Sequence, residues 1–327
     1  MKTKILAVLV ILTFGLFSCQ KQDGVQPTST TNLSDAQLKS ATIAVNDVAI
    51  EGVAQEANFE TDFYAGYENM LRQLAHIKGG KGMLMEGRQG MHYIAGHSPL
   101  VSIDTAATGY PIVITIAYGD NTITKNGREI GGTVKIEISG KSAIDGNTRK
   151  ISYMGCSIDS MKIEGTSTQT FSSNTRITHK MTTTSDVTFT LANGTVINRV
   201  EDMVREWLKG FDNPKDGDYM VMITGSIQVK SSKGNTYTRL ITEPLIRLED
   251  CHYAVQGTVQ FKQNDIVIGE LNYGDGKCDN LAELTTGSET IDIKLEGKMP
   301  KADLKNHHHG NMGGNGNMGG NGGMGGK

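Results

Sequence analysis

The sequence predicts a mainly β protein: a large curved antiparallel sheet, a sandwich or an open barrel of about a dozen strands. A short N-terminal helical region precedes this sheet, and a disordered tail follows it. Apolar and polar residues alternate from about residue 110 to residue 296, so each strand is expected to bury one face and expose the other. Turn dipeptides such as Asn126-Gly127 and Asp275-Gly276 separate the alternating runs at short intervals. About a dozen strands are too many for one flat sheet, so we expect the sheet to curve or close.

The first 18 residues have the features of a secretory signal peptide. Lys2 and Lys4 provide positive charge ahead of an almost unbroken apolar run, Ile5 to Phe17. As a helix this run of 13 residues would reach only about 20 Å, whereas a hydrocarbon core is about 30 Å thick. The run therefore predicts an export signal and not a membrane span.

The residues at the end of this signal, Leu16-Phe17-Ser18-Cys19, resemble the lipobox of bacterial lipoproteins. The resemblance implies cleavage before Cys19, a diacylglycerol on its thiol and a fatty acyl group, such as palmitate, on its amine. Several acyl chains anchor a protein to a membrane almost permanently. Gln20 stands where an aspartate would, by the same resemblance, retain the protein in the inner membrane, so we expect the outer membrane. Whether the protein faces the periplasm or the cell surface stays open, as does an ordinary signal peptide with a chance cysteine.

Three segments are expected between the signal and the β domain. Residues 19–33 are polar and predict a lipidated tether. Residues 34–79 predict the helical region, because apolar residues recur at helical spacing and Ser34 with Gln37 suits an N-terminal capping box. The glycine-rich residues 80–108 are expected to form a connector.

The β domain is expected at residues 109–297, and the disordered tail at 298–327. A Tyr-Gly-Asp turn followed by a hairpin occurs twice, at Tyr118 and at Tyr273. This repeat is compatible with two related β modules and also with one sheet that bends repeatedly. Three strand glycines, each followed by a hydroxyl residue, predict bulges or close backbone contacts that curve a sheet. They are Gly165, Gly225 and Gly257. Residues 197–208 fit a short helix or a strand, and their β neighbours favour a strand.

The most specific motif of the β region is Cys251 followed by Tyr273-Gly274-Asp275-Gly276-Lys277-Cys278-Asp279-Asn280. Together with Arg205-Glu206-Trp207 and the lipobox, this motif resembles a group of Bacteroidota outer-membrane lipoproteins with a β-rich domain. No activity is established for that group. The resemblance covers roughly residues 105–296, and it implies the compartment and the fold class but no catalytic residue.

Three cysteines remain besides Cys19, an odd number for an oxidising compartment. Cys251 opens one expected strand, and Cys278 follows the turn after the next strand, so a meander would bring them together. We therefore predict a Cys251–Cys278 disulfide, with Cys156 buried and free. Closing a loop of about 28 residues would stabilise the fold by about 3–4 kcal/mol.

Two segments contain residues that could bind a metal ion. In the turn before the second cysteine of that pair, Asn272, Asp275 and Asp279 offer oxygen ligands to calcium, although ordinary hairpin chemistry also explains this turn. In the tail, imidazole and thioether groups suit copper, but a flexible low-complexity spacer explains the same repeat. These tail residues are His307, His308, His309, Met312, Met318 and Met324.

Charge and motifs narrow the range of functions. The formal net charge is -3, so no strong basic field attracts nucleic acid. The sequence contains no HExxH, GxSxG or SxxK motif with supporting partners, which favours a non-enzymatic function and leaves an enzyme open. We expect a lipid-anchored binding or accessory module of the cell envelope, with an outer-membrane barrel protein or a glycan as partner. The alternatives are a carrier of a lipid or other hydrophobic ligand, and copper capture by the tail.

Overall fold

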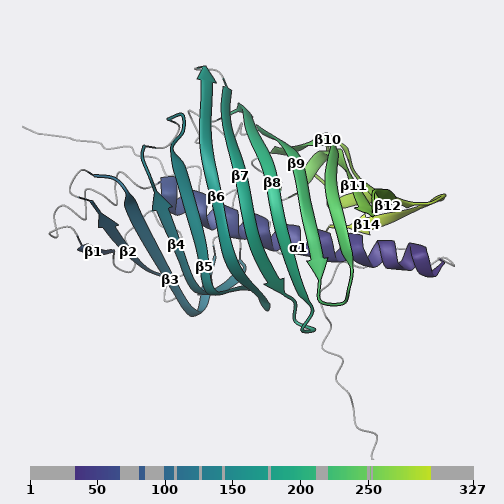
Figure 1. Ribbon diagram of the computed structural model, residues 1–327, viewed down its shortest axis with the longest axis horizontal. Helices are drawn as coiled ribbons and strands as arrows, with labels where there is room; N and C mark the ends of the chain where they lie inside the picture. The colour runs from purple at the N-terminus through teal and green to yellow at the C-terminus, as the bar shows by residue number, and fades with distance from the viewer. Residues whose placement is uncertain are drawn as a thin grey trace, which may run out of the picture.

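The computed structural model describes residues 34–66, 81–84, 99–106, 109–124, 127–141, 144–175, 178–210, 220–248, 251 and 253–295. In these residues the chain forms one helix and one antiparallel sheet of 14 strands. The strands lie in the sheet in the order of the chain, and the first and last strands are not paired with each other. The predicted fold class is therefore confirmed in the form of one open, curved sheet (Figure 1).

The elements are α1 (Asp35–Gly66), β1 (Lys81–Leu84), β2 (Leu100–Thr105), β3 (Ile112–Ile123), β4 (Glu129–Ile138), β5 (Thr148–Ile158), β6 (Met161–Thr175), β7 (Thr178–Thr190), β8 (Val196–Lys209), β9 (Met220–Ser231), β10 (Thr236–Leu248), β11 (Ala254–Gln263), β12 (Ile266–Asp275), β13 (Leu281–Thr286) and β14 (Glu289–Lys294).

Helix α1 begins where the sequence predicts. The backbone nitrogen of Gln37 donates to Ser34 Oγ at 3.4 Å, and the backbone nitrogen of Ser34 donates to Gln37 Oε1 at 2.8 Å. This reciprocal pair is a capping box, which satisfies amide groups that the first turn leaves open. The helix then runs for 32 residues to Gly66, about 48 Å at the usual rise. The rest of the expected helical region, 67–79, lies outside the described residues.

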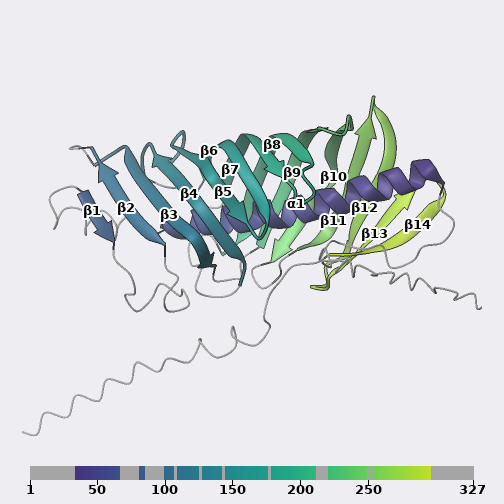
Figure 2. The ribbon, with the colours of Figure 1, turned by 90° about the horizontal axis from the view of Figure 1, so that it is seen from below.

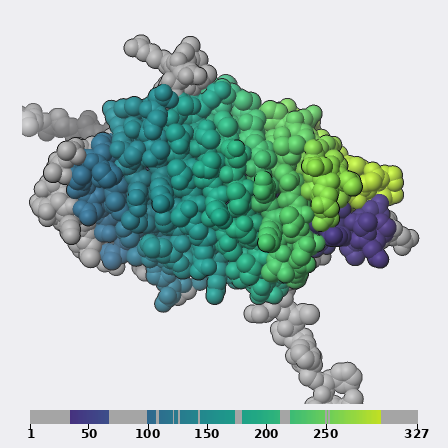
Figure 3. Space-filling model, viewed as in Figure 1, coloured from purple at the N-terminus to yellow at the C-terminus, as the bar shows by residue number. Residues whose placement is uncertain are grey.

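The sheet curves around α1, which crosses the strands along the concave face (Figure 2). At the N-terminal end of the helix, the Gln37 side chain donates to the backbone oxygen of Thr286 at the end of β13. Near its C-terminal end, Glu60 accepts a hydrogen bond from the hydroxyl of Tyr118 on β3. Viewed from the convex side, the strands hide α1 except near β14 (Figure 3). The concave face of the sheet, which we call the trough, is therefore occupied by the helix.

Alternation along the strands produces the core between the sheet and the helix. On β3, Ile112, Ile114 and Ile116 are fully buried, and the residues between them are more exposed. Ile50 and Tyr64 of α1 are also fully buried and belong to the same cluster. Because each buried aliphatic side chain stabilises the fold by roughly 1.5–3 kcal/mol, the alternation decides which face of each strand meets α1.

Three strand glycines bend the sheet, as the sequence predicts. Gly165, Gly225 and Gly257 have φ angles of 124°, 129° and 109°, which side-chain-bearing residues rarely adopt. A Cβ atom at any of them would lie 2.2–2.4 Å from a backbone oxygen of a neighbouring strand. The strand pairing shifts register beside each glycine, so these positions combine a bulge with close backbone contact.

The structure corrects one expectation, decides between two alternatives that the sequence left open, and confirms a further expectation. Strands β1 and β2 lie within residues 80–108, so this range is not only a connector, and the sheet begins before residue 109. The two related modules that the sequence left open are parts of one continuous sheet. Residues 197–208 lie in strand β8, as the sequence favoured, because β7 and β9 pair with this segment on both sides.

Candidate functional site

Buried ion pairs connect α1 to the floor of the trough. Arg239 of β10 places Nε 2.9 Å from Asp47 Oδ2, and both side chains are only 1% exposed. Arg199 of β8 places Nη2 3.1 Å from Glu51 Oε2, and its own side chain is fully buried. Charged side chains thus occupy core-facing positions of α1, β8 and β10 that usually hold apolar residues. Arg239 is thus compensated by a residue that is distant in the chain, whereas Arg199 is compensated both by distant Glu51 and by Glu201 of the same strand, whose Oε1 lies 3.4 Å from Nη2.

A third pair extends this arrangement toward the other end of the helix. Arg149 of β5 forms an ion pair with Asp62, and its Nε donates to Gln169 Oε1 on β6. Along α1 the three acidic partners follow one another in the same order as β10, β8 and β5 follow across the sheet. The pairs therefore fix both the direction and the register of α1 in the trough. We call Arg239–Asp47, Arg199–Glu51 and Arg149–Asp62 the ionic ladder.

Burial and charge act against each other in this ladder. Burial raises the pKa of Asp47, and the charges of Arg239 and Arg199 only partly offset that effect. Burial alone would also raise the pKa of Glu51, but the charges of Arg239 and Arg199 outweigh it and lower this pKa to about 2. Burial opposes the charge of Arg239, yet Asp47 and Glu51 raise its pKa above the usual value. Glu51 and both arginines therefore remain charged at neutral pH.

Several polar atoms below the helix have no hydrogen-bond partner among the described residues. They include Nε and Nη1 of Arg199. Three polar atoms on the concave face of β6 and β7 also have no hydrogen-bond partner among the described residues: Gln169 Nε2, Thr183 Oγ1 and Ser185 Oγ. A buried donor without a partner costs about 1–3 kcal/mol, and more when it is charged. Such groups are explained by water or by a ligand.

A cavity lies beside the Arg239–Asp47 pair, between α1 and strands β8 to β12. Its polar lining comes from Glu51, Gln55, Arg239, Arg247, Tyr253 and Tyr273. Its apolar lining comes from Val48, Met203, Ile223, Leu245, Ala254 and Leu295. The space open to the centre of a water molecule is about 30 Å³, enough for about two waters. The cavity thus combines buried cationic donors with an aliphatic wall.

The convex face presents a second feature, an apolar patch at one end of β8, β9 and β10. On β9, Met222 pairs in register with Glu206 on β8 and with Ile246 on β10, so their side chains share the convex face. Leu208 is 46% exposed, and the other members of the patch are partly exposed. We define the convex patch as Val204, Leu208, Met220, Met222, Ile246 and Leu248. A solvent-facing sheet surface usually presents polar residues here.

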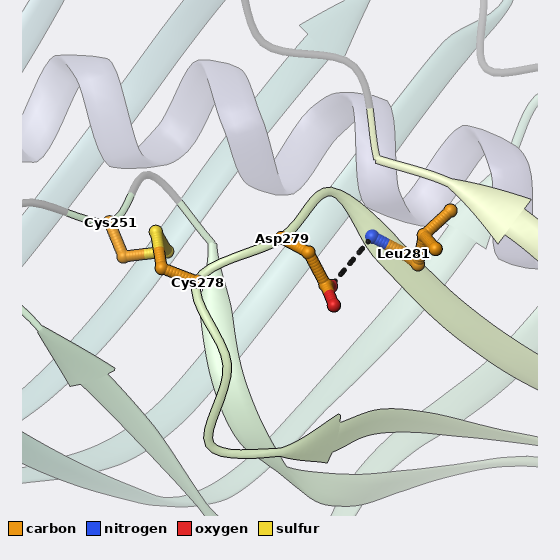
Figure 4. Close-up of a disulfide and its surroundings, with 4 residues drawn as sticks. All are labelled: Cys251, Cys278, Asp279 and Leu281. Carbon is orange, nitrogen blue, oxygen red and sulfur yellow. Dashed lines mark hydrogen bonds between the residues drawn. A yellow bond between two sulfur atoms is a disulfide. The ribbon is translucent and has the colours of Figure 1, made fainter.

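The predicted disulfide is present. Cys251 and Cys278 are bonded, with Cα atoms 5.6 Å apart, and Cys156 is buried and free (Figure 4). Burial raises the pKa of the Cys156 thiol to about 12, so this thiol is a poor nucleophile. The disulfide ties the start of β11 to the segment between β12 and β13, as a meander of neighbouring strands allows.

The residues considered for calcium serve the turns around this disulfide. Asn272 Oδ1 accepts from the backbone nitrogen of Gly274 at 2.7 Å, and Asp279 Oδ1 accepts from that of Leu281 at 3.1 Å (Figure 4). Asp275 forms an exposed ion pair with Lys277. Local turn geometry accounts for all three. Within the described segments, no cluster of three or more His, Cys, Asp or Glu side chains is placed to hold a metal ion.

Several sequence-based predictions fall outside the described residues: the signal peptide, Cys19 with its tether, and the His/Met tail with His307, His308, His309, Met312, Met318 and Met324. They stay predictions. Trp207 packs against the core cluster. In the part of the chain that the structure describes, no helix is both long and apolar enough to cross a membrane.

The ionic ladder was missed at the sequence level, although a signal for it exists. Arg199 stands between Ile197 and Met203 in the inward phase of β8, and Arg239 stands between Tyr237 and Ile241 in that of β10. Asp47 similarly interrupts the apolar face of the helix. A charged residue in an apolar phase indicates a buried partner, but periodicity alone cannot name that partner.

Comparisons of the chain with protein-family models, with curated proteins and with solved structures found no match. The functional argument therefore rests on the trough and on the convex patch.

Proposed function

We propose that the protein is a lipid-anchored, non-enzymatic binding module of the cell envelope. Its partner is a membrane protein that docks on the convex patch. The observation that carries this proposal is the row of aliphatic and methionine side chains on the solvent side of β8, β9 and β10. Contiguous exposed apolar surface commonly marks a protein-binding site. A glycan would be a poorer occupant, because the patch offers few hydrogen-bonding groups.

The anchor limits where such a partner can be. With lipid on Cys19, the 15 residues from Gln20 to Ser34 connect the bilayer to the first residue of α1. Fully extended, they span at most about 50 Å. The sheet therefore stays within reach of proteins embedded in the same membrane, which favours an outer-membrane barrel protein over a freely diffusing partner.

Purification from native membranes in a gentle detergent, followed by mass spectrometry, tests the proposal. We expect a stoichiometric barrel protein to accompany the wild type and to be lost from Met222→Glu, which places a charge in the convex patch. The matched control is Gln228→Glu, an exposed position on the same face of the same strand. Equal retention of the barrel by both variants, or no co-purifying barrel in the wild type, would contradict a partner on this patch.

A second candidate function, a carrier of a hydrophobic ligand, would require α1 to move away from the sheet, because the cavity between them has room for only about two waters. The wall of this cavity is largely aliphatic, and α1 covers it as a lid would. Organic extraction of the purified protein and mass spectrometry of the extract provide the test. A carrier should release acyl compounds beyond those attached at Cys19, and an extract without them would count against this function.

A further inference from the structure

We propose that α1 is a releasable strap, which leaves the trough as a unit while the sheet keeps its structure. Release exposes the concave face of the sheet without unfolding the strands. The strap rests on the carrier function only in what would take the place of α1. The movement itself is a property of this chain and has its own test.

The interface between α1 and the sheet is rich in polar groups. Fourteen residues of α1 are buried, and five of these are polar or charged: Ser40, Asp47, Glu56, Glu60 and Thr61. The concave face of the strands adds further buried polar side chains: Arg149, Ser167, Gln169, Thr183, Ser185, Arg199 and Arg239. Polar groups regain water when two surfaces separate, so such an interface opens at a lower cost than an apolar one.

The middle of this interface is a polar seam, which we define as Ser167 and Gln169 of β6 with Thr183 and Ser185 of β7. Ser167 pairs in register with Ser185, and Gln169 with Thr183, so the four side chains share the concave face. The seam lies between two pairs of the ionic ladder, because β6 and β7 separate β5 from β8.

The seam contains atoms that gain from release. All four of its side chains are at most 8% exposed. Gln169 Nε2, Thr183 Oγ1 and Ser185 Oγ have no hydrogen-bond partner among the described residues. A buried polar atom without a partner destabilises the closed form, and release of α1 brings water to all three. The seam therefore favours release at the centre of α1.

The ionic ladder makes closure specific without making release expensive. When α1 leaves the trough, the charged groups of the ladder return to water, and their hydration largely offsets the lost attraction. Closure in another register would leave Arg239 or Arg199 buried away from its acidic partner, which is costly. The ladder therefore guides α1 back to one position.

The sheet has its own connections and can persist without α1. Each strand is paired with the next along the chain, and the Cys251–Cys278 disulfide closes without α1. Release exposes an apolar surface on β3 and β4, whose side chains are at most 2% exposed in the closed form: Ile112, Ile114, Ile116, Val134 and Ile136. Contact of this surface with water opposes release, so α1 stays closed in the empty protein. An apolar occupant would shift the balance toward the open form.

Hydrogen–deuterium exchange of the full-length lipidated protein in lipid nanodiscs tests the strap. The readout is the protection of the central amides of α1, residues 50–58, compared with the amides of β6 and β7. We expect the central α1 amides to exchange together and at least about 100-fold faster than the sheet amides, because release leaves the sheet folded. Equal protection of α1 and the two strands would mean that α1 separates only on global unfolding, and would overturn the strap.

Thr183→Val tests the seam. Valine has nearly the shape of threonine but no hydroxyl that regains water on release. We therefore expect α1 exchange to slow at least about fivefold, a difference of about 1 kcal/mol. The matched control is Thr184→Val, an exposed position on the same strand, which should exchange like the wild type. Equal α1 exchange in the two variants would remove the seam as the cause of release and overturn the proposal.

The strap and the carrier function fail separately. Fast α1 exchange in a protein whose organic extract contains no additional acyl compound would keep the strap and remove the carrier. Acyl compounds in the extract of a protein whose α1 exchanges only with the sheet would place lipid binding elsewhere and overturn the strap.

Discussion

At Asp47 a carboxyl group lies in the buried face of α1, between Ala44 and Val48, and meets Arg239 across the trough. Taking both groups out of water costs several kcal/mol per ion, which their attraction only approximately repays. The pair adds little net stability compared with hydrocarbon, but it penalises any register of α1 that separates the two groups. The pair therefore contributes more to the correct placement of α1 than to stability.

Asp47→Ala should lower the free energy of unfolding by about 3–5 kcal/mol, because Arg239 is left buried without its compensating charge. Asp47→Leu combined with Arg239→Met should restore most of that loss. Urea denaturation measures both, and Asp145→Ala in an exposed turn is the control, with an expected change below about 0.5 kcal/mol. A loss below about 1 kcal/mol for Asp47→Ala would show that the pair is not closed in solution.

Glu51 gives the ladder a dependence on pH. Its pKa is lowered in the folded protein from 4.5 to about 2, so it contributes stability above pH 4.5 that is lost as the pH falls toward 2. The shift corresponds to about 3 kcal/mol. Asp47, with its raised pKa, acts in the opposite direction.

The test is to follow the free energy of unfolding between pH 5 and pH 2 in the wild type and in Glu51→Gln. The slope should be clearly smaller in the variant, which is also less stable at neutral pH. Parallel curves for the two proteins would exclude Glu51 as a source of the acid sensitivity.

At the scale of the elements, glycine bends are what let long strands curve around a helix. Gly225→Ala should destabilise the protein by more than about 2 kcal/mol, because its φ of 129° and a contact of 2.2 Å with the Asp202 oxygen both exclude a methyl group. Gly269→Ala on β12 is the control, since its nearest neighbour lies 3.4 Å away and its φ is not positive. Thermal unfolding compares the two variants, and equal losses of stability would show that the bend does not require glycine at position 225.

The disulfide and the buried thiol make a second prediction at this scale. Without reductant, a thiol reagent should label no cysteine in the folded protein and one, Cys156, after denaturation. Cys19 should not react, because its thiol is expected to carry lipid. Labelling of three thiols after denaturation without reductant would mean that Cys251 and Cys278 are not bonded in the native protein.

At the scale of the whole molecule, a sheet of 14 strands in chain order forms through contacts between sequence neighbours, whereas α1 contacts strands far along the chain. The helix joins distant strands into one body because β3, β8, β10 and β13 all bond to it. A partner on the convex patch would therefore bind the face of the sheet opposite to α1.

Cys19→Ser should move the protein from the membrane fraction to the soluble envelope fraction, because the lipid is the expected attachment. Mass spectrometry of the wild-type N-terminal peptide should find an acylated Cys19. Cell fractionation that leaves the variant in the membrane would point to an attachment other than this lipid, such as the barrel partner.

The sequence by itself determined the β class, the strand phase, the bends and the disulfide. Each of these depends on local chemistry: alternation sets which side chains are buried, glycine alone adopts the bend angles, and a meander places Cys251 beside Cys278. The same local reasoning resolved residues 197–208 in favour of a strand.

Only the tertiary structure decided how α1 lies in the trough and which charges meet there. Arg239 and Asp47 are 192 positions apart in the chain, and no periodicity links them. Strand β1, by contrast, lies in glycine-rich sequence with little intrinsic β preference, so pairing with its neighbour decides its state. Strand β2 contains no glycine and alternates buried with exposed residues, so a local signal for it was present and was missed. A buried charge needs a partner of opposite charge, and the partner comes within reach only when the sheet has curved around the helix.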